Sequence, residues 1–198
     1  MKRSLMAGTA AVTALVLAAC SPQSHDETPM ASAGPSISTG NKLVAPRVPN
    51  ALNVSKFEQD PCTVLSPAQA GEIANWTTSS KADGNAAPIC TWADKDHNTV
   101  TIGFVPGNGG LTTSYKNQDS KYGYFAVAPD VEGYPAVYSA AHDDRGEGGC
   151  LVAVGVSDDE VFTTSVSFRK NLSPHYSDPC PVASRTAEAA MVTIKGGA

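Results

Sequence analysis

Side chains able to do chemistry are few in this sequence, and they are spread along it. Imidazoles beside carboxylates are typical ligands of zinc, and clustered carboxylates of calcium. No histidine here has a metal-site spacing such as H-x-x-x-H, and the loop around His142 is rich in Asp and Gly, which is typical of a solvated turn. We therefore expect no metal site. The pairs concerned are His142 with Asp143 and Asp144, His97 with Asp96, and His175 with Asp178.

Motifs for hydrolytic catalysis are absent from the sequence. It contains no G-x-S-x-G, no S-x-x-K with its partner motifs and no H-E-x-x-H. The run from Gly107 to Gly110 lacks the Lys-Ser/Thr of a phosphate loop. Two carboxylates brought together from distant positions would leave no local pattern, so an enzyme with a dispersed site stays open. The prediction is a non-catalytic protein without a cofactor.

Tyrosines are concentrated between residues 115 and 138, among glycines and prolines. Such a segment could line a pocket or form a surface for a partner. The alternative, which we favour, is that alternate aromatic rings fill the core beneath weak strands while the hydroxyls reach solvent. The tyrosines considered as a binding surface are Tyr115, Tyr122, Tyr124, Tyr134 and Tyr138.

The start of the chain has the pattern of an export signal. Lys2 and Arg3 precede an apolar run over 7–17, and small residues lie before Cys20. The run is too short for a membrane-spanning helix. A Cys directly after Leu-Ala-Ala resembles the lipobox of bacterial lipoproteins. This resemblance implies that residues 1–19 are removed and that Cys20 is acylated. The lipid bilayer would then hold the protein on the extracytoplasmic face of the cell membrane.

Composition divides the rest of the chain into two parts. Residues 20–57 are rich in Ser, Pro, Ala, Thr and Asn, which predicts a disordered tether with an average span of about 35 Å. Residues 58–198 have the size of one domain. Loss of the signal would change the formal net charge from -5 to about -7. Such an acidic balance argues against nucleic acid as a partner.

Four cysteines remain after Cys20, and an even number in an exported chain predicts two disulfides. Three connectivities are possible. Cys62 and Cys180 each follow Asp-Pro, which is typical of a helix start, whereas Cys90 and Cys150 border strand-like runs. We favour the local pairs Cys62–Cys90 and Cys150–Cys180. Zinc is disfavoured because no C-x-x-C pair is present.

Hydrophobic periodicity and turn residues predict an α+β fold. We expect an antiparallel sheet of about five or six strands, with the N- and C-terminal helices packed on one face. Ser66 and Gln69 match a capping box that would begin a helix at 67. The Ala-rich last helix should carry one apolar stripe, formed by Ala183, Ala187, Ala190, Met191 and Ile194. The expected helices cover 67–74, 109–116 and 179–194, and the expected strands cover 90–93, 99–105, 124–128, 136–139, 151–156 and 161–168.

The order of these motifs resembles that of an actinobacterial family of secreted lipoproteins of unknown function. The shared features are the lipobox, the tether, two Asp-Pro-Cys motifs, the strand Cys90-Thr91-Trp92 and the late Cys150. The family supplies no catalytic residues. Its pattern is similar to the PsbP-like fold, which implies binding of an envelope ligand or of another exported protein. A surface display or structural protein is a further alternative.

Overall fold

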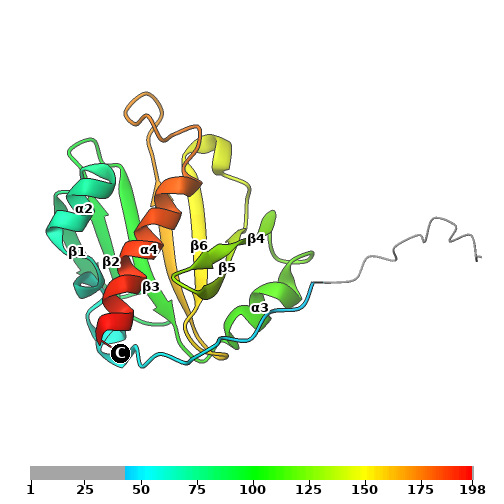
Figure 1. Cartoon of the computed structure of the whole chain (residues 1–198). Coiled ribbons are helices and arrows are strands. Elements are labelled where there is room, and N and C mark those ends of the chain that lie inside the picture. Colours follow the sequence, from blue (N-terminus) through cyan, green and yellow to red (C-terminus); the bar gives the residue numbers. More distant parts are fainter. Residues whose placement is uncertain (1–42, 198) are drawn as a thin grey trace, which may run out of the picture. The chain divides into compact units, whose positions relative to one another are not determined.

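The computed structural model describes residues 43–197, in which β-branched and aromatic runs form strands and Ala-rich or capped runs form helices (Figure 1). The helices are α1 (Ser55–Gln59), the 3-10 helix η1 (Pro61–Val64), α2 (Pro67–Ala74), α3 (Gly110–Asn117), the 3-10 helix η2 (Arg145–Glu147) and α4 (Cys180–Gly197). The strands are β1 (Thr78–Ala82), β2 (Ile89–Ala93), β3 (Thr99–Val105), β4 (Tyr124–Val131), β5 (Tyr134–Ala140), β6 (Gly149–Gly155) and β7 (Val161–Ser167).

All seven strands pair in one antiparallel sheet of order β1-β2-β3-β7-β6-β5-β4. The predicted α+β class is therefore confirmed, with more strands than expected. The additional strand is β1, whose five residues are all exposed. An edge strand with no buried side chain has no hydrophobic alternation, so sequence periodicity could not reveal it.

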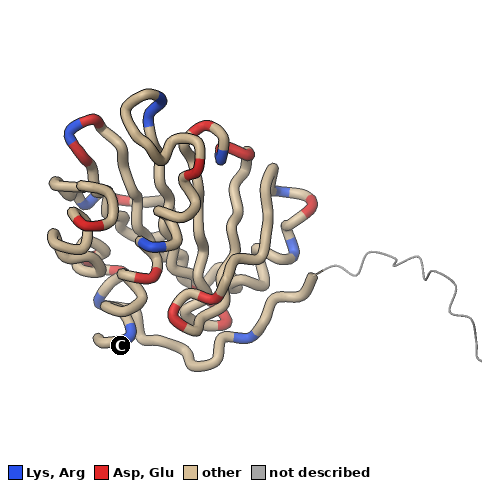
Figure 2. Tube along the Cα trace, turned by 45° about the horizontal axis from the view of Figure 1, so that its top comes forward, with Lys and Arg blue, Asp and Glu red and all other residues tan. Residues whose placement is uncertain are grey.

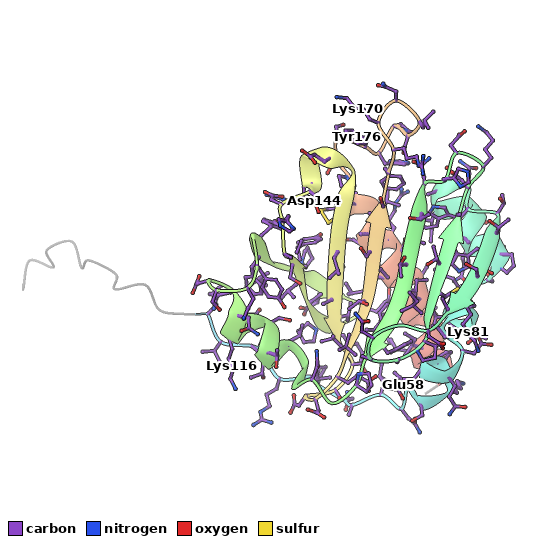
Figure 3. The ribbon with its side chains drawn as sticks, turned by 180° about the vertical axis from the view of Figure 1, so that it is seen from behind. Glu58, Lys81, Lys116, Asp144, Lys170 and Tyr176 are labelled. Atoms are coloured by element: carbon purple, nitrogen blue, oxygen red, sulfur yellow. A yellow bond between two sulfur atoms is a disulfide. The ribbon has the colours of Figure 1, made fainter. Side chains whose placement is uncertain are left out.

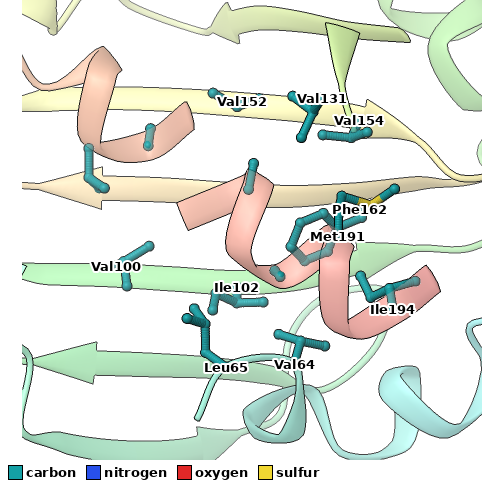
Figure 4. Packing of buried hydrophobic residues seen from close by; sticks show 14 of the residues in the cluster. Val64, Leu65, Val100, Ile102, Val131, Val152, Val154, Phe162, Met191 and Ile194 are labelled. Atoms are coloured by element: carbon teal, nitrogen blue, oxygen red, sulfur yellow. The ribbon is translucent and has the colours of Figure 1, made fainter. Parts of the chain in front are cut away.

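The main core lies between one face of the sheet and α4 (Figure 4). Strand residues that alternate towards this face include Ile102, Val152 and Phe162, all fully buried. Ala183 and Ala187 present only methyl groups, so α4 can lie close to the strands. The predicted Ala-rich apolar stripe of the last helix is thus confirmed. Helix α2 shares this face with α4, and the predicted capping box of Ser66 and Gln69 begins it.

Helix α3 covers part of the opposite face of the sheet. Val137 and Ala153 pair across β5 and β6, and each points away from the α4 side because its chain neighbours point towards it. Leu111 and Tyr115 of α3 pack on them in a second, smaller core. The rest of this face, seen in Figure 3, carries mainly small hydroxyl side chains on the central strands.

Residues 43–54, here called the strap, run extended past α3 and along the strand ends (Figure 1). The Leu52 N–H donates to the Val156 carbonyl at 2.9 Å, and Arg47 pairs with Asp158 at 2.7 Å. Val54 is buried in the main core. The folded part thus begins before residue 58. Composition did not reveal this boundary, because averaging over the stretch concealed its few apolar residues.

Both predicted disulfides are confirmed. Cys62–Cys90 joins η1 to β2, and Cys150–Cys180 joins β6 to the first residue of α4. Asp60 takes the N-cap position of η1 before Pro61, as the Asp-Pro motif predicts, but its side chain makes no capping hydrogen bond. Cys20 lies outside the described residues. Within 43–197, no helix is long and apolar enough to span a membrane.

Candidate functional site

A cavity of about 780 Å³ lies between the N-terminal half of α4, strands β4 and β5, and η2. We call it the α4 cleft. Helix α4 contributes Pro181, Ser184, Arg185 and Glu188, which recur at helical spacing beside the apolar stripe. One helix thus packs its alanine face on the sheet and presents a polar edge to the cavity.

The sheet wall of the α4 cleft is formed by Tyr124 of β4 and Tyr138 of β5. Both rings lie on the α4 side of the sheet because Tyr138 pairs with Ala126, two residues after Tyr124. The Tyr138 hydroxyl and the Ser184 hydroxyl are 2.9 Å apart and share a hydrogen bond. This bond joins α4 to β5 within the lining of the cleft.

Arg145 of η2 is held in place by two neighbours at once. Its guanidinium carbon lies 3.4 Å from the centroid of the Tyr124 ring. Its Nε and Nη2 atoms donate to the two carboxylate oxygens of Asp143, each at 2.7 Å. These hydrogen bonds lower the pKa of Asp143 and raise that of Arg145. A bidentate pair that also stacks on an aromatic ring has little rotational freedom left.

The Cys150–Cys180 disulfide determines where the helix wall of the α4 cleft begins. Cys180 and Pro181 both line the cavity, and the disulfide attaches this end of α4 to β6. A second cavity of about 310 Å³ adjoins the α4 cleft, since Tyr124 and Arg145 line both spaces.

The five tyrosines considered from the sequence do not form one surface. Only Tyr124 and Tyr138 line the α4 cleft. Tyr134 is buried in the main core. Tyr115 packs against Phe125 in the second core on the other face of the sheet, with ring centroids 5.2 Å apart. The Tyr122 ring stacks with Phe125 as well, with centroids 6.2 Å apart. Burial, followed by the charge of Asp130, raises the pKa of Tyr115.

Several residues of the α4 cleft were missed at the sequence level. Ser184, Arg185 and Glu188 could have been recognised as a polar edge beside the apolar stripe of the predicted last helix. Arg145 carries no such signal, because its role depends on Tyr124 and on the turn geometry of η2. Charged residues lie mainly in loops and at element ends (Figure 2), so charge pattern alone does not indicate the site.

The three histidines considered as metal ligands have different surroundings. His175 packs against Phe168 with ring centroids 5.4 Å apart, His97 occupies a turn at φ 61°, and His142 is exposed. Within the part of the chain that the structure describes, no group of three or more His, Cys, Asp or Glu side chains could hold a metal ion.

Two glutamates meet at the end of the domain where the strap crosses. Glu58 of α1 lies at this end in Figure 3, and Glu160 begins the return from the β6–β7 turn. The Oε1 atom of Glu160 is buried without a hydrogen-bond partner. Burial, together with the charge of Glu58 and a hydrogen bond between the two carboxyls, raises the pKa of Glu160 from 4.5 to about 7.

This carboxyl pair makes stability depend on pH. A raised pKa in the folded state contributes stability below pH 4.5, and this contribution is lost as the pH rises through about 7. The full shift corresponds to about 3 kcal/mol, which solvent screening of the half-exposed group reduces to about 1–2 kcal/mol. We expect Glu160→Gln to lose less stability than the wild type between pH 5 and pH 8, measured by urea unfolding. Parallel loss in both proteins would contradict the assignment.

Comparison with known proteins gives one match. The family model described as a protein of unknown function, DUF3558, matches residues 15–193. None of the curated proteins and none of the solved structures compared matches the chain, so the PsbP-like resemblance stays a prediction. Because the matched region includes the described strands and helices up to Thr193 of α4, the chain belongs to the DUF3558 family of proteins of unknown function.

Proposed function

We propose that this protein is a membrane-anchored extracytoplasmic lipoprotein, of the actinobacterial kind that its motifs resemble, and that it acts as a non-catalytic binding or accessory module of the cell envelope. The ligand site is the α4 cleft. The observation that carries this proposal is the size of the cleft, about 780 Å³, beside a helix that a disulfide attaches to the sheet. Preformed cavities of roughly 300–1,000 Å³ are the usual ligand sites of proteins.

The polar groups of the α4 cleft support binding more than catalysis. Tyr138 and Ser184 hydrogen-bond to each other, and Arg145 is paired with Asp143, so none of them has a base positioned to activate it. The raised pKa of Glu160 would suit a general acid, but neither Glu160 nor Glu58 lines this cleft. An envelope hydrolase or a surface display protein therefore remains only an alternative outcome of the tests below.

The anchor is tested by Cys20→Ala. Without the thiol there is no acyl attachment, and the described domain has no spanning helix to hold it in the bilayer. We expect the variant to move almost completely from the membrane fraction to the soluble fraction, measured by immunoblot after ultracentrifugation. Cys20→Ala protein that stays with the membranes after a salt wash would contradict acylation as the anchor.

The site is tested by filling the α4 cleft. In Ser184→Trp an indole replaces a hydroxyl that lines the cavity, so it should exclude a ligand sterically. The immobilised protein is incubated with envelope extract, and retained glycans, lipids and proteins are identified by mass spectrometry. We expect a component retained by the wild type and lost from this variant. Ser120→Trp, at an exposed position outside the cleft, is the control and should retain it.

Two results would weigh against the proposal. If the Ser184→Trp protein melts well below the wild type, the retention experiment is repeated with Glu188→Gln, a smaller change at an exposed position of α4. If neither cleft variant changes what is retained, the α4 cleft is not the ligand site. Turnover of any retained component would instead favour the hydrolase.

A further inference from the structure

Large apolar side chains that are exposed gather on one side of the described domain. Within residues 43–197 they are Leu43, Val44, Val127, Leu172 and Val192. The first two are adjacent at the start of the strap, beside α3. Val127 lies on the α3 side of the sheet, because it pairs with Val137 of the second core. Single exposed apolar residues need no explanation, but adjacent ones that form one surface indicate a contact site.

Leu43 and Val44 line a cavity of about 250 Å³ together with α3. We call this surface the exit patch, because the described domain begins there; its other residues are Ala45, Thr112, Tyr115 and Lys116. Its walls are almost entirely apolar, whereas those of the α4 cleft are polar and apolar in about equal parts. Val44 is 85 % exposed and Leu43 is 51 % exposed, so most of their apolar surface faces outwards.

The exposed side chains of the exit patch project from a backbone that the rest of the domain holds in place. Gln118 of α3 donates from Nε2 to the Leu43 carbonyl at 3.3 Å. Further along the strap, Arg47 pairs with Asp158 at 2.7 Å. Beneath them, the second core fixes α3 on the sheet (Figure 3, where Lys116 marks this helix). The patch is therefore formed before any partner arrives, and contact with it costs little conformational entropy.

The exit patch lies where the predicted tether joins the folded domain. Because the folded part begins at residue 43, the tether predicted from composition shortens to residues 20–42. A flexible chain of that length has an average span of about 25 Å. Acylated Cys20 would thus hold residue 43 close to the bilayer, as the described residue with the shortest path of chain to it. Such a tether raises the effective concentration of the bilayer at the patch, so even a weak contact is populated.

We propose that the exit patch docks on the lipid bilayer, with Leu43 and Val44 entering the boundary between headgroups and acyl chains. This inference rests on the proposed function, because only an anchored chain keeps the patch at the bilayer. Lys116 suits the edge of such a contact, since a lysine places its stem along apolar surface and its charged end among headgroups. The exit patch shares no residue with the α4 cleft.

Tryptophan fluorescence in vesicles tests the docking. The mature chain with its acyl groups is reconstituted into phosphatidylcholine vesicles with or without bromine on the upper part of the lipid acyl chains, where it quenches an indole only at close range. Trp76 and Trp92 are buried, so the wild type supplies a constant background. Val44→Trp places the probe in the exit patch. Val192→Trp, at an exposed valine of α4 on the opposite side of the sheet, is the matched control.

The added emission should report insertion at residue 44 only. We expect bromine to quench it by about half in Val44→Trp and by less than about a tenth in Val192→Trp, since interfacial side chains lie about 5–10 Å into this boundary. Adding Leu43→Asp to Val44→Trp should remove most of the quenching, because a carboxylate resists transfer into apolar surroundings. Leu172→Asp, at a leucine that is also 51 % exposed but lies outside the patch, should leave it intact. Thermal melting checks that every variant is folded.

Vesicle flotation separates failure of the docking from failure of the proposed function. Protein that does not float with the vesicles lacks the acyl anchor, which overturns the anchor and the docking together. Floating protein in which Val44→Trp and Val192→Trp are quenched equally, or not at all, overturns the docking alone. Sedimentation of the Cys20→Ser chain should show a monomer. A dimer that Leu43→Asp dissociates would assign the exit patch to a second copy of the chain instead.

Discussion

Replacing Cys150 and Cys180 together by alanine should lower the free energy of unfolding by about 3–4 kcal/mol. The disulfide closes a loop with a sequence separation of 30, and its removal returns that conformational freedom to the unfolded chain. The same change releases the first residue of α4 from β6, so the helix wall of the α4 cleft loses its attachment. Urea unfolding measures the first effect, and titration of the cleft ligand measures the second.

The Cys62→Ala, Cys90→Ala double variant separates these two effects. Its loop has a nearly equal sequence separation of 28, so the loss of stability should be similar. Neither cysteine lines the α4 cleft, so ligand affinity measured well below the melting temperature should stay close to that of the wild type. Equal loss of affinity in both double variants would show that the Cys150–Cys180 disulfide has no special role in shaping the site.

Phe162→Ala should be the most destabilising single substitution among those considered, by about 3–5 kcal/mol. Phe162 is fully buried on the central strand β7, and its ring packs on that of Phe104 with centroids 5.2 Å apart. Removing it leaves a cavity beneath α4, near Met191 (Figure 4). Denaturant unfolding with the disulfides intact measures the change.

Val127→Ala is the control for this substitution. Val127 lies on β4 and is 54 % exposed, so its truncation should change stability by no more than about 0.5 kcal/mol. A loss below about 1.5 kcal/mol for Phe162→Ala would mean that α4 settles onto the sheet and fills the space. In that case the α4 cleft would change shape as well, and ligand affinity would report it.

Local signals predicted most of the fold. Ser66 with Gln69 predicted the start of α2, β-branched alternation predicted β3 and β7, and the alanine stripe predicted α4 and its buried face. Each of these signals is encoded within a few neighbouring residues. Strand β1 and the strap escaped prediction because their order comes from contacts with distant segments rather than from their own pattern.

The candidate site was harder to predict than the fold. Tyr124 and Tyr138 were recognised as aromatic candidates, but nothing local distinguished them from Tyr134, which is buried, or Tyr115, which lies on the other face. The face of the sheet on which each tyrosine lies can be assigned only after the strand register is known. The partner of Tyr138 is Ser184, forty-six positions further along the chain, so no window of sequence contains both.

The strap gives the domain a particular response to mechanical tension. A pull on the chain at residue 43 would act first on the Gln118 contact with Leu43, then on the contacts of Asp158 with Arg47 and Val48, and only then on the Leu52 bond to Val156. The contacts of Leu43, Arg47 and Val48 are exposed and individually weak, so they would break one after another before the Leu52 bond. About 40 Å of extended chain would be released before the load reached Val54, the first residue of the strap that is buried. No residue of the strap lines the α4 cleft, so these contacts would break without removing any part of its lining.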